Sequence, residues 1–189
     1  MNSALIIAGT EKSAAYYNEI LTSASIGQIV TLSSCGDARR LLVERDFDLV
    51  VINAPLKDET GENLSRHIAS IGKSQVILTV QMEYFEAVSS ICENDGVLTV
   101  SRPINRSLFW SALMLAKSAQ NRIQRMQLEN VKLKQKIEDI RIVDRAKWIL
   151  VSCMNMTEKE AHRYIEKQAM DLRATRRAVA ERVLKTYET

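Results

Sequence analysis

The sequence has few residues of the kinds that interrupt or cross-link a chain. Its 189 residues include 6 Gly, 2 Pro and 3 Cys, and aromatic residues make up 5%. Scarce glycine and proline favour long uninterrupted helices. Cys35, Cys92 and Cys153 are odd in number and far apart, so we interpret each as a small apolar residue in a reduced compartment. A disulfide-rich secreted scaffold is excluded.

Signals for targeting, membranes and catalysis are also missing. We find no basic and apolar leader and no run of 18 apolar residues. His67 and His162 have no metal-ligand spacing around them, and there is no Gly-rich phosphate loop and no nucleophile elbow. We therefore expect a cytoplasmic protein of bacterial type that is not an enzyme and takes no metal, cofactor or membrane.

Charge is distributed unevenly along the chain. Residues 1–116 hold 9 Lys and Arg against 13 Asp and Glu, whereas residues 117–189 hold 17 against 10. The net charge of +3 is therefore the sum of an acidic front half and a basic back half. A basic back half suggests contact with a polyanion, although a solvated basic helix face would look the same.

The front half alternates apolar runs with amphipathic segments. The expected strands cover residues 3–8, 28–33, 48–53, 75–80 and 96–100. The expected helices between them cover residues 14–24, 37–45, 61–71 and 83–92. This order predicts an α/β fold, a doubly wound five-stranded parallel sheet.

The middle of the chain carries a heptad pattern, which predicts a long coiled-coil helix over residues 105–145. Positions spaced alternately by 3 and 4 are Phe109, Ala112, Ala116, Ala119, Ile123, Met126, Asn130, Leu133, Ile137 and Ile140. Asn130 is the one polar member, and a buried Asn of this kind sets the register of a parallel dimer. We therefore predict a homodimer whose seam comprises Ile123, Met126, Asn130, Leu133, Ile137 and Ile140. The alternative is a helix that packs within its own chain.

The last part predicts two further helices, which complete a small three-helix bundle. Residues 152–156 are expected to break the long helix. Thr157 and Glu160 have the spacing of a capping box, so a helix should begin at Glu158. Thr175 is the expected N-cap of a final helix through Val183. Helices this short need to pack on one another and on the long helix.

Residues 1–118 resemble the receiver domain of response regulators. The resemblance is carried by the third strand and its loop, from Asp48 to Gly61, by Thr79 and by the pair Arg102 and Pro103.

The resemblance implies a phosphoacceptor aspartate, acidic magnesium ligands and a lysine. Here those positions hold Asn53, Ala8 with Gly9, and Arg102. A carboxamide is a poor phosphoryl acceptor, and Ala and Gly offer no oxygen ligand. We therefore predict a pseudo-receiver, with a regulatory protein partner as a possible input. We do not expect Asp58 to act as a substitute acceptor.

Residues 134–189 resemble the ANTAR domain of bacterial transcription antiterminators. The matching pieces are Ala146-Lys147, Thr157 to Ala161, and Gln168 to Arg173. The resemblance implies a response regulator of a two-component system that binds paired RNA stem-loops as a dimer. Trp148 replaces the usual glycine, and we expect it to be a core residue rather than a platform for a base.

The residues expected to touch RNA lie in or beside these pieces. Lys and Arg hold phosphates, whereas amides and aromatic rings read or stack on unpaired bases. The candidates are Lys147, Arg163, Tyr164, Lys167, Gln168, Arg173, Arg176 and Arg177. Competing interpretations are a DNA-binding transcriptional regulator and a protein-interaction scaffold.

Overall fold

The computed structural model describes residues 1–187 and divides into two units, a front unit, Met1–Gln124, and a back unit, Arg125–Thr189. The front unit contains the expected parallel sheet, so the prediction of an α/β fold is confirmed. Its strands are β1 (Ser3–Ala8), β2 (Gln28–Leu32), β3 (Leu49–Asn53), β4 (Gln75–Gln81) and β5 (Leu98–Arg102). Its helices are α1 (Glu11–Ser23), α2 (Cys35–Glu44), α3 (Glu62–Ile71), α4 (Phe85–Cys92) and the start of α5 (Arg106–Met154), with short 3-10 turns η1 (Met82–Tyr84) and η2 (Glu93–Asp95).

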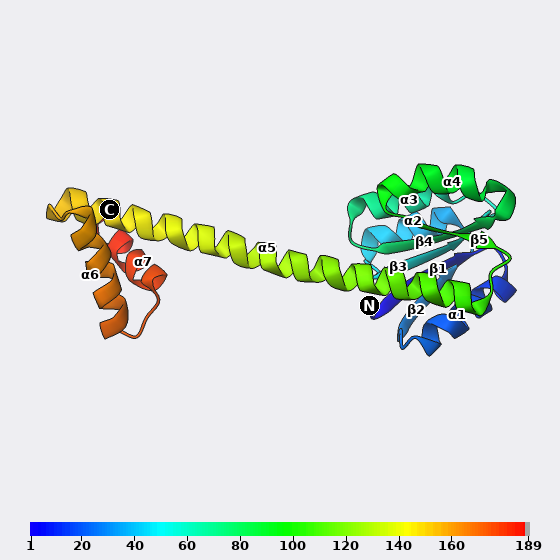
Figure 1. The fold of residues 1–189 in the computed structure, drawn as a ribbon, viewed down its shortest axis with the longest axis horizontal. Coiled ribbons are helices and arrows are strands. Elements are labelled where there is room, and N and C mark those ends of the chain that lie inside the picture. Colours follow the sequence, from blue (N-terminus) through cyan, green and yellow to red (C-terminus); the bar gives the residue numbers. More distant parts are fainter. Residues whose placement is uncertain (188–189) are drawn as a thin grey trace. The chain divides into compact units, whose positions relative to one another are not determined.

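The strands lie in the order β2-β1-β3-β4-β5, all parallel. Helices α2, α3 and α4 cover one face of the sheet, and α1 and α5 cover the other (Figure 1). The chain runs from β1 to β2 at one edge of the sheet. It then crosses to β3 on the other side of β1 and continues to β4 and β5, so β1 and β3 flank the topological switch point. Functional groups of such sheets gather at the carboxyl ends of these strands.

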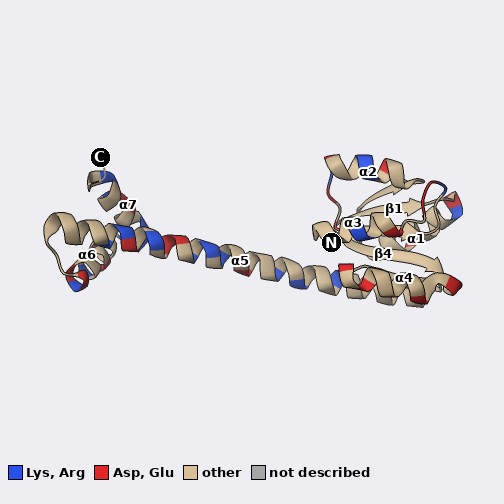
Figure 2. Cartoon of the chain, turned by 90° about the horizontal axis from the view of Figure 1, so that it is seen from above, with Lys and Arg blue, Asp and Glu red and all other residues tan. Residues whose placement is uncertain are grey.

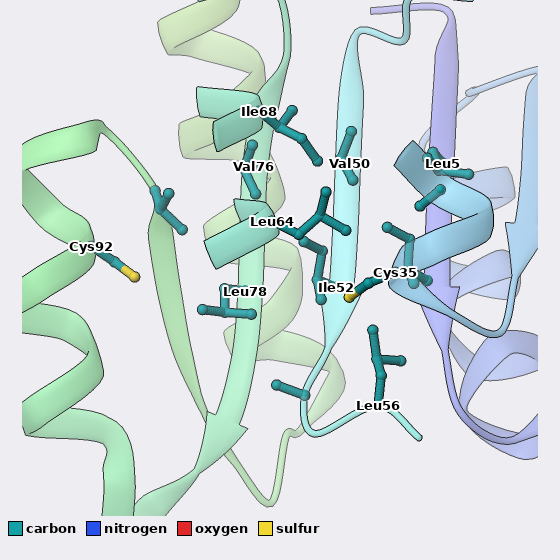
Figure 3. Close-up of a cluster of buried hydrophobic side chains, with 14 of the residues drawn as sticks. Leu5, Cys35, Val50, Ile52, Leu56, Leu64, Ile68, Val76, Leu78 and Cys92 are labelled. Carbon is teal, nitrogen blue, oxygen red and sulfur yellow. The ribbon is translucent and has the colours of Figure 1, made fainter. Parts of the chain in front are cut away.

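Two apolar clusters hold the sheet between its helices. One joins Leu64 and Ile68 of α3 and Cys35 of α2 to Val50 and Ile52 of β3 (Figure 3). The other joins α1 and α5 to β1 and the opposite face of β3. All five residues of β3 are buried, as expected of a central strand covered on both faces.

Several element boundaries differ from the predicted ones because of local caps. Helix α1 begins at Glu11 rather than at residue 14, since the Thr10 side chain accepts a hydrogen bond from the Ser13 amide. Helix α2 begins at Cys35 rather than at residue 37, with Ser34 as its N-cap. Strand β5 begins at Leu98 rather than at residue 96, because Gly96 ends η2 in the left-handed conformation.

Helix α5 is a single helix of 49 residues, and its first turns are part of the front-unit core. Phe109, Ala112, Leu113 and Ala116 are buried against the sheet. Packing within one chain therefore accounts for the heptad positions Phe109, Ala112 and Ala116, which lie before the predicted dimer seam. The heptad positions from Met126 to Ile140 are exposed in the single chain.

The back unit packs α6 (Glu158–Asp171) and α7 (Arg176–Tyr187) against the end of α5. Its core contains Ala146, Leu150, Ala161, Ile165, Ala169, Val179, Ala180 and Val183. The capping box of Thr157 and Glu160 is present, and the Thr175 hydroxyl accepts from the Ala178 amide. Helix α5 continues to Met154, so residues 152–154 do not break it as predicted. The predicted last domain extends to residue 189, and residues 188–189 lie outside the described part of the chain.

Candidate functional sites: a closed acceptor pocket and a basic face

The position of the receiver phosphoacceptor is occupied by a buried cluster of three polar side chains. Asn53 ends β3 and pairs with Thr79 across the β3–β4 register. The Tyr17 hydroxyl, from α1, donates to Asn53 Oδ1 at 3.0 Å, and the Thr79 hydroxyl donates to the same oxygen at 2.9 Å. The two hydroxyl oxygens are 3.1 Å apart. The carboxamide oxygen is therefore engaged inside the protein rather than presented to a ligand.

Tyr17 covers this polar cluster from the side of α1. Its ring packs on Phe109 with centroids 5.0 Å apart and is buried in the apolar cluster beneath the sheet. Burial raises the pKa of the Tyr17 hydroxyl, because the phenolate would lose its hydration. The hydroxyl therefore stays protonated and remains a hydrogen-bond donor to its polar neighbours.

The residues at the magnesium positions of a receiver do not fit that ion here. Ala8 is buried in the core and Gly9 carries no side chain, so neither supplies the hard oxygen that Mg²⁺ requires. Asn53 Oδ1 already accepts two hydrogen bonds. The site therefore lacks the ligand chemistry of a metal-assisted phosphoryl transfer.

Asp58 has a structural role next to this pocket. Its carboxylate accepts from the amides of Gly36 at 3.0 Å and Cys35 at 3.1 Å, at the N-terminus of α2. The Gly36 hydrogen bond is the largest of the effects that lower the pKa of Asp58. Cys35 and Glu59 lie close enough to share a metal ion with Asp58. However, burial raises the pKa of the Cys35 thiol to about 11, and Glu59 is paired with Arg39.

Arg102, which matches the receiver lysine, points toward the loop that follows β3. Its Nη2 donates to the carbonyl of Ala54. Its Nε is buried without a hydrogen-bond partner among the described residues. The guanidinium thus braces the loop beside Asn53, a contact that a lysine ammonium does not reproduce with the same planar geometry.

In the back unit, a basic hollow lies between α5, α6 and the start of α7. It has a volume of about 500 Å³. Its lining residues are Lys136, Asp139, Ile140, Val143, Asp144, Lys147, His162, Thr175, Arg176 and Arg177. Three of the predicted RNA contacts, Lys147, Arg176 and Arg177, therefore meet in one place. Figure 2 shows positive and negative residues interspersed on these helices.

Ion pairs within the unit partly neutralise the basic hollow. Arg177 bonds Asp139 at 2.8 Å, and Arg176 bonds Glu166 at 3.2 Å. Because Asp139 and Glu166 are partly exposed, phosphate can compete for both guanidinium groups. Their charge is therefore available to a polyanion, at the cost of the internal pairs.

Lys147 differs from the two arginines because its side chain is largely enclosed, with 16% exposed. Its ammonium lies 2.7 Å from Asp144 on α5 and 3.5 Å from Glu158 on α6. The hydrogen bond to Asp144 is the main cause of its raised pKa. Lys147 therefore ties the start of α6 to α5, a role that its sequence position did not predict.

The other candidates lie on a different side of α6. Arg163 and Lys167 are exposed, and Tyr164 and Gln168 are partly exposed one helical turn apart. At about 100° per residue, Tyr164 points roughly opposite to His162 and Glu166, which face the hollow and Arg176. Arg173 is exposed in the α6–α7 loop with a φ of 49°. The eight predicted residues thus form two groups rather than one surface.

Trp148 is not a core residue, and the prediction of a core role is wrong. Its side chain is 73% exposed and lines a second hollow of about 360 Å³ with Val151, Lys147 and Glu158. The helical period explains this: Ala146 and Leu150 point into the bundle, and Trp148 lies about 200° from each around α5. A glycine-to-tryptophan change at this position adds an exposed indole without altering the core.

Sequence reasoning missed Tyr17, Lys136 and the structural role of Lys147. No motif surrounds Tyr17, and only the packing of α1 brings it to Asn53, 36 residues away in the chain. Lys136 lies on α5, and its place in the basic hollow depends on where α7 packs. These contacts are long-range, so no local spacing signals them.

Comparison with known proteins agrees with this two-part architecture. Residues 131–184 match the family model of the ANTAR domain. The chain is 28% identical over 142 residues to the transcriptional regulatory protein PdtaR of Mycobacterium tuberculosis, covering 75% of this chain and 69% of that protein.

Solved receiver domains share the fold of the front unit. The signal receiver domain of an HD domain-containing protein from Pseudomonas fluorescens Pf-5 aligns with a TM-score of 0.56 at 21% identity, covering 65% of this chain and 91% of that one. A response regulator receiver domain from Clostridium thermocellum aligns with a TM-score of 0.57 at 17% identity, covering 67% and 99%. Among residues 1–187, no helix is both long and apolar enough to cross a bilayer.

The relative is named as a transcriptional regulatory protein. Residues 131–184 therefore match the ANTAR domain, and the front unit has the fold of receiver domains.

Proposed function

We propose that this chain is a dimeric RNA-binding antiterminator that binds paired stem-loops in leader RNA. The observation that carries the proposal is the ANTAR match over residues 131–184, the segment that contains the basic hollow and the outer face of α6. Exposed arginine and lysine supply phosphate contacts, and Tyr164 and Gln168 offer a ring and an amide to unpaired bases. When the protein holds the paired stem-loops, a competing terminator hairpin does not form and transcription continues.

The dimer would form along α5. We name Met126, Leu133, Ile137 and Ile140 the exposed stripe; each side chain is more than half exposed in the single chain. Apolar residues at heptad spacing on one helix face pack against the same face of a second copy. Two linked sites then bind two loops of one RNA with a gain in effective concentration.

The front unit would work without phosphorylation. Asn53 offers a carboxamide in place of the nucleophilic carboxylate, and Ala8 and Gly9 offer no metal ligand. Control would then pass through a protein partner or through abundance. Incubation with acetyl phosphate and Mg²⁺ should give no acid-stable or acid-labile label, and a phosphoryl adduct on Asp58 would contradict this inference.

The decisive test compares binding of the purified chain to a two-hairpin leader RNA and to a DNA duplex of equal length, by fluorescence anisotropy. We expect tighter binding to the RNA, and tighter binding to two hairpins than to one. Preference for the duplex would favour a DNA-binding regulator. Equal, weak binding to both would favour a protein-interaction scaffold.

The dimer is tested with Ile123→Lys combined with Ile137→Lys. A lysine pair in the seam should give monomers in sedimentation equilibrium and lower the affinity for two-hairpin RNA toward that for one hairpin. Val43→Lys, a change at an exposed apolar residue of the front unit, is the control. A wild-type chain that is monomeric at micromolar concentration would refute the dimer.

A further inference from the structure

Trp148 continues the exposed stripe beyond the point where the heptad pattern ends. After Ile137 and Ile140, the next heptad positions are Asp144 and Lys147. The Lys147 side chain is folded against Asp144 and Glu158 rather than presented at a seam. Its neighbour Trp148 is 73% exposed, the largest apolar side chain on this part of α5. The apolar face therefore does not stop at Ile140 but shifts by one residue.

The shift has the spacing of a stutter in a coiled coil. From Ile137 this face runs through the exposed positions Ile140, Asp144 and Trp148 to Val151, which is half-buried against the back-unit core, in steps of 3, 4, 4 and 3. An extra four-residue step locally unwinds a left-handed supercoil and keeps one face aligned over 11 residues. At about 100° per residue, Trp148 points within about 20° of Ile137, whereas Lys147 points about 80° away on the other side.

The surroundings of Trp148 suit a protein surface better than a nucleic acid. Asp144 and Glu158 line the same hollow, and their carboxylates repel phosphate. Both acids share the single positive charge of Lys147, so Asp144, Glu158 and Lys147 together leave a net negative charge beside the indole, which disfavours a phosphate backbone. An indole buries roughly 150–250 Å² in an interface. That is a sizeable part of the roughly 800 Å² that each partner buries in an interface of standard size.

We propose that Trp148 is the C-terminal anchor of the dimer contact and that its occupant is α5 of a second copy of this chain. This inference rests on the proposed dimer and extends it into the ANTAR domain. Each indole packs over the end of the other copy's α5, beside Val151 on its own helix. The two ANTAR domains are thereby held together at their α5 ends, which limits the spacing between the two loops that one dimer can bind.

The test is Trp148→Ala in the full-length chain, with Met170→Ala as the matched control. Met170 is an equally exposed large apolar residue of the same unit, on α6 and off the stripe. The dimer dissociation constant is measured by sedimentation equilibrium, and affinity is measured on a one-hairpin RNA and on a two-hairpin RNA. We expect Trp148→Ala to raise the dimer dissociation constant about tenfold or more, with one-hairpin affinity unchanged and Met170→Ala without effect.

Three other outcomes overturn the inference. If Trp148→Ala leaves the dimer intact but weakens one-hairpin binding, the indole stacks on RNA. If it changes neither, Trp148 is an exposed side chain without a partner. A wild-type monomer would refute the proposed dimer and this inference together, whereas a wild-type dimer insensitive to Trp148→Ala refutes only the inference.

Discussion

At the scale of single residues, Tyr17 engages the polar side chains at the acceptor position. Its hydroxyl reaches Asn53 and Thr79 from α1, and all three side chains are buried. A buried polar group is costly unless it is hydrogen-bonded, and here each member satisfies another. The adjacent Tyr16 provides a contrast, because its hydroxyl is buried without a hydrogen-bond partner in the described part of the chain.

We expect Tyr17→Phe to lower the free energy of unfolding by about 1 kcal/mol, since the polar group left at Asn53 loses one donor. Tyr16→Phe should be neutral or slightly stabilising, because it removes a hydroxyl that has no partner. Urea denaturation followed by circular dichroism measures both. Equal effects of the two variants would contradict the assigned hydrogen bonds.

The raised pKa of Tyr17 predicts a loss of stability at alkaline pH. In the unfolded chain the phenol ionises near its ordinary value of about 10, whereas the folded protein retains the proton to higher pH. The contribution is therefore fully present below about pH 10 and is lost as pH rises toward the folded pKa. Urea midpoints from pH 8 to 11 should fall more steeply for the wild type than for Tyr17→Phe. Parallel curves would argue against a raised pKa.

At the scale of elements, Lys147 joins two helices that are separated by a turn. Its ammonium bridges Asp144 on α5 and Glu158 in the first turn of α6. The acid at Glu158 is also well placed for the positive end of the α6 dipole. Lys147, which the sequence predicts as an RNA contact, therefore also links two helices of the bundle.

Lys147→Ala should consequently lower the stability of the back unit by about 1 kcal/mol, an amount kept small by the exposure of both acids. Arg163→Ala, at an exposed position of α6, should leave stability unchanged. Thermal melts of the two variants provide the comparison. If Lys147→Ala melts like the wild type but binds RNA less well, the residue acts on the RNA alone.

At the scale of the whole molecule, the two groups of predicted RNA contacts make separable predictions. One group comprises Arg163, Lys167 and Arg173, and the other comprises Arg176 and Arg177 in the basic hollow. Alanine at each phosphate contact should weaken binding similarly for all loop sequences and reduce the salt slope by about one counterion or slightly less. A base contact instead changes affinity for one loop position, by about 1–3 kcal/mol by analogy with duplex readout.

We therefore expect the triple alanine variant of Arg163, Lys167 and Arg173 to lose between about two and three counterions from the salt dependence. Alanine at Lys12 and Lys57, exposed lysines of the front unit, is the control. Anisotropy titrations between 50 and roughly 200 mM salt measure the slopes. Unchanged affinity in the triple variant and in Arg176→Ala with Arg177→Ala would leave the basic surfaces without an RNA role.

Much of this organisation is readable from local patterns in the sequence. The alternation of apolar strands and amphipathic helices determines the parallel sheet, because the period of apolar residues selects the element that can bury them. The Thr157–Glu160 spacing determines the start of α6 through contacts only three residues apart. Ala8, Gly9 and Asn53 stand where a receiver has acidic residues, so the sequence alone shows that these acidic groups are missing.

Only the tertiary structure decided which faces are used and which polar groups meet. Phe109 and Ile137 share one heptad pattern, yet the first is buried against the sheet and the second is exposed, because the sheet covers only the start of α5. Trp148 points outward because Ala146 and Leu150 point inward toward α6 and α7. Tyr17 reaches Thr79 across 62 residues of sequence. Such contacts depend on how elements pack, and short-range sequence spacing carries no information about them.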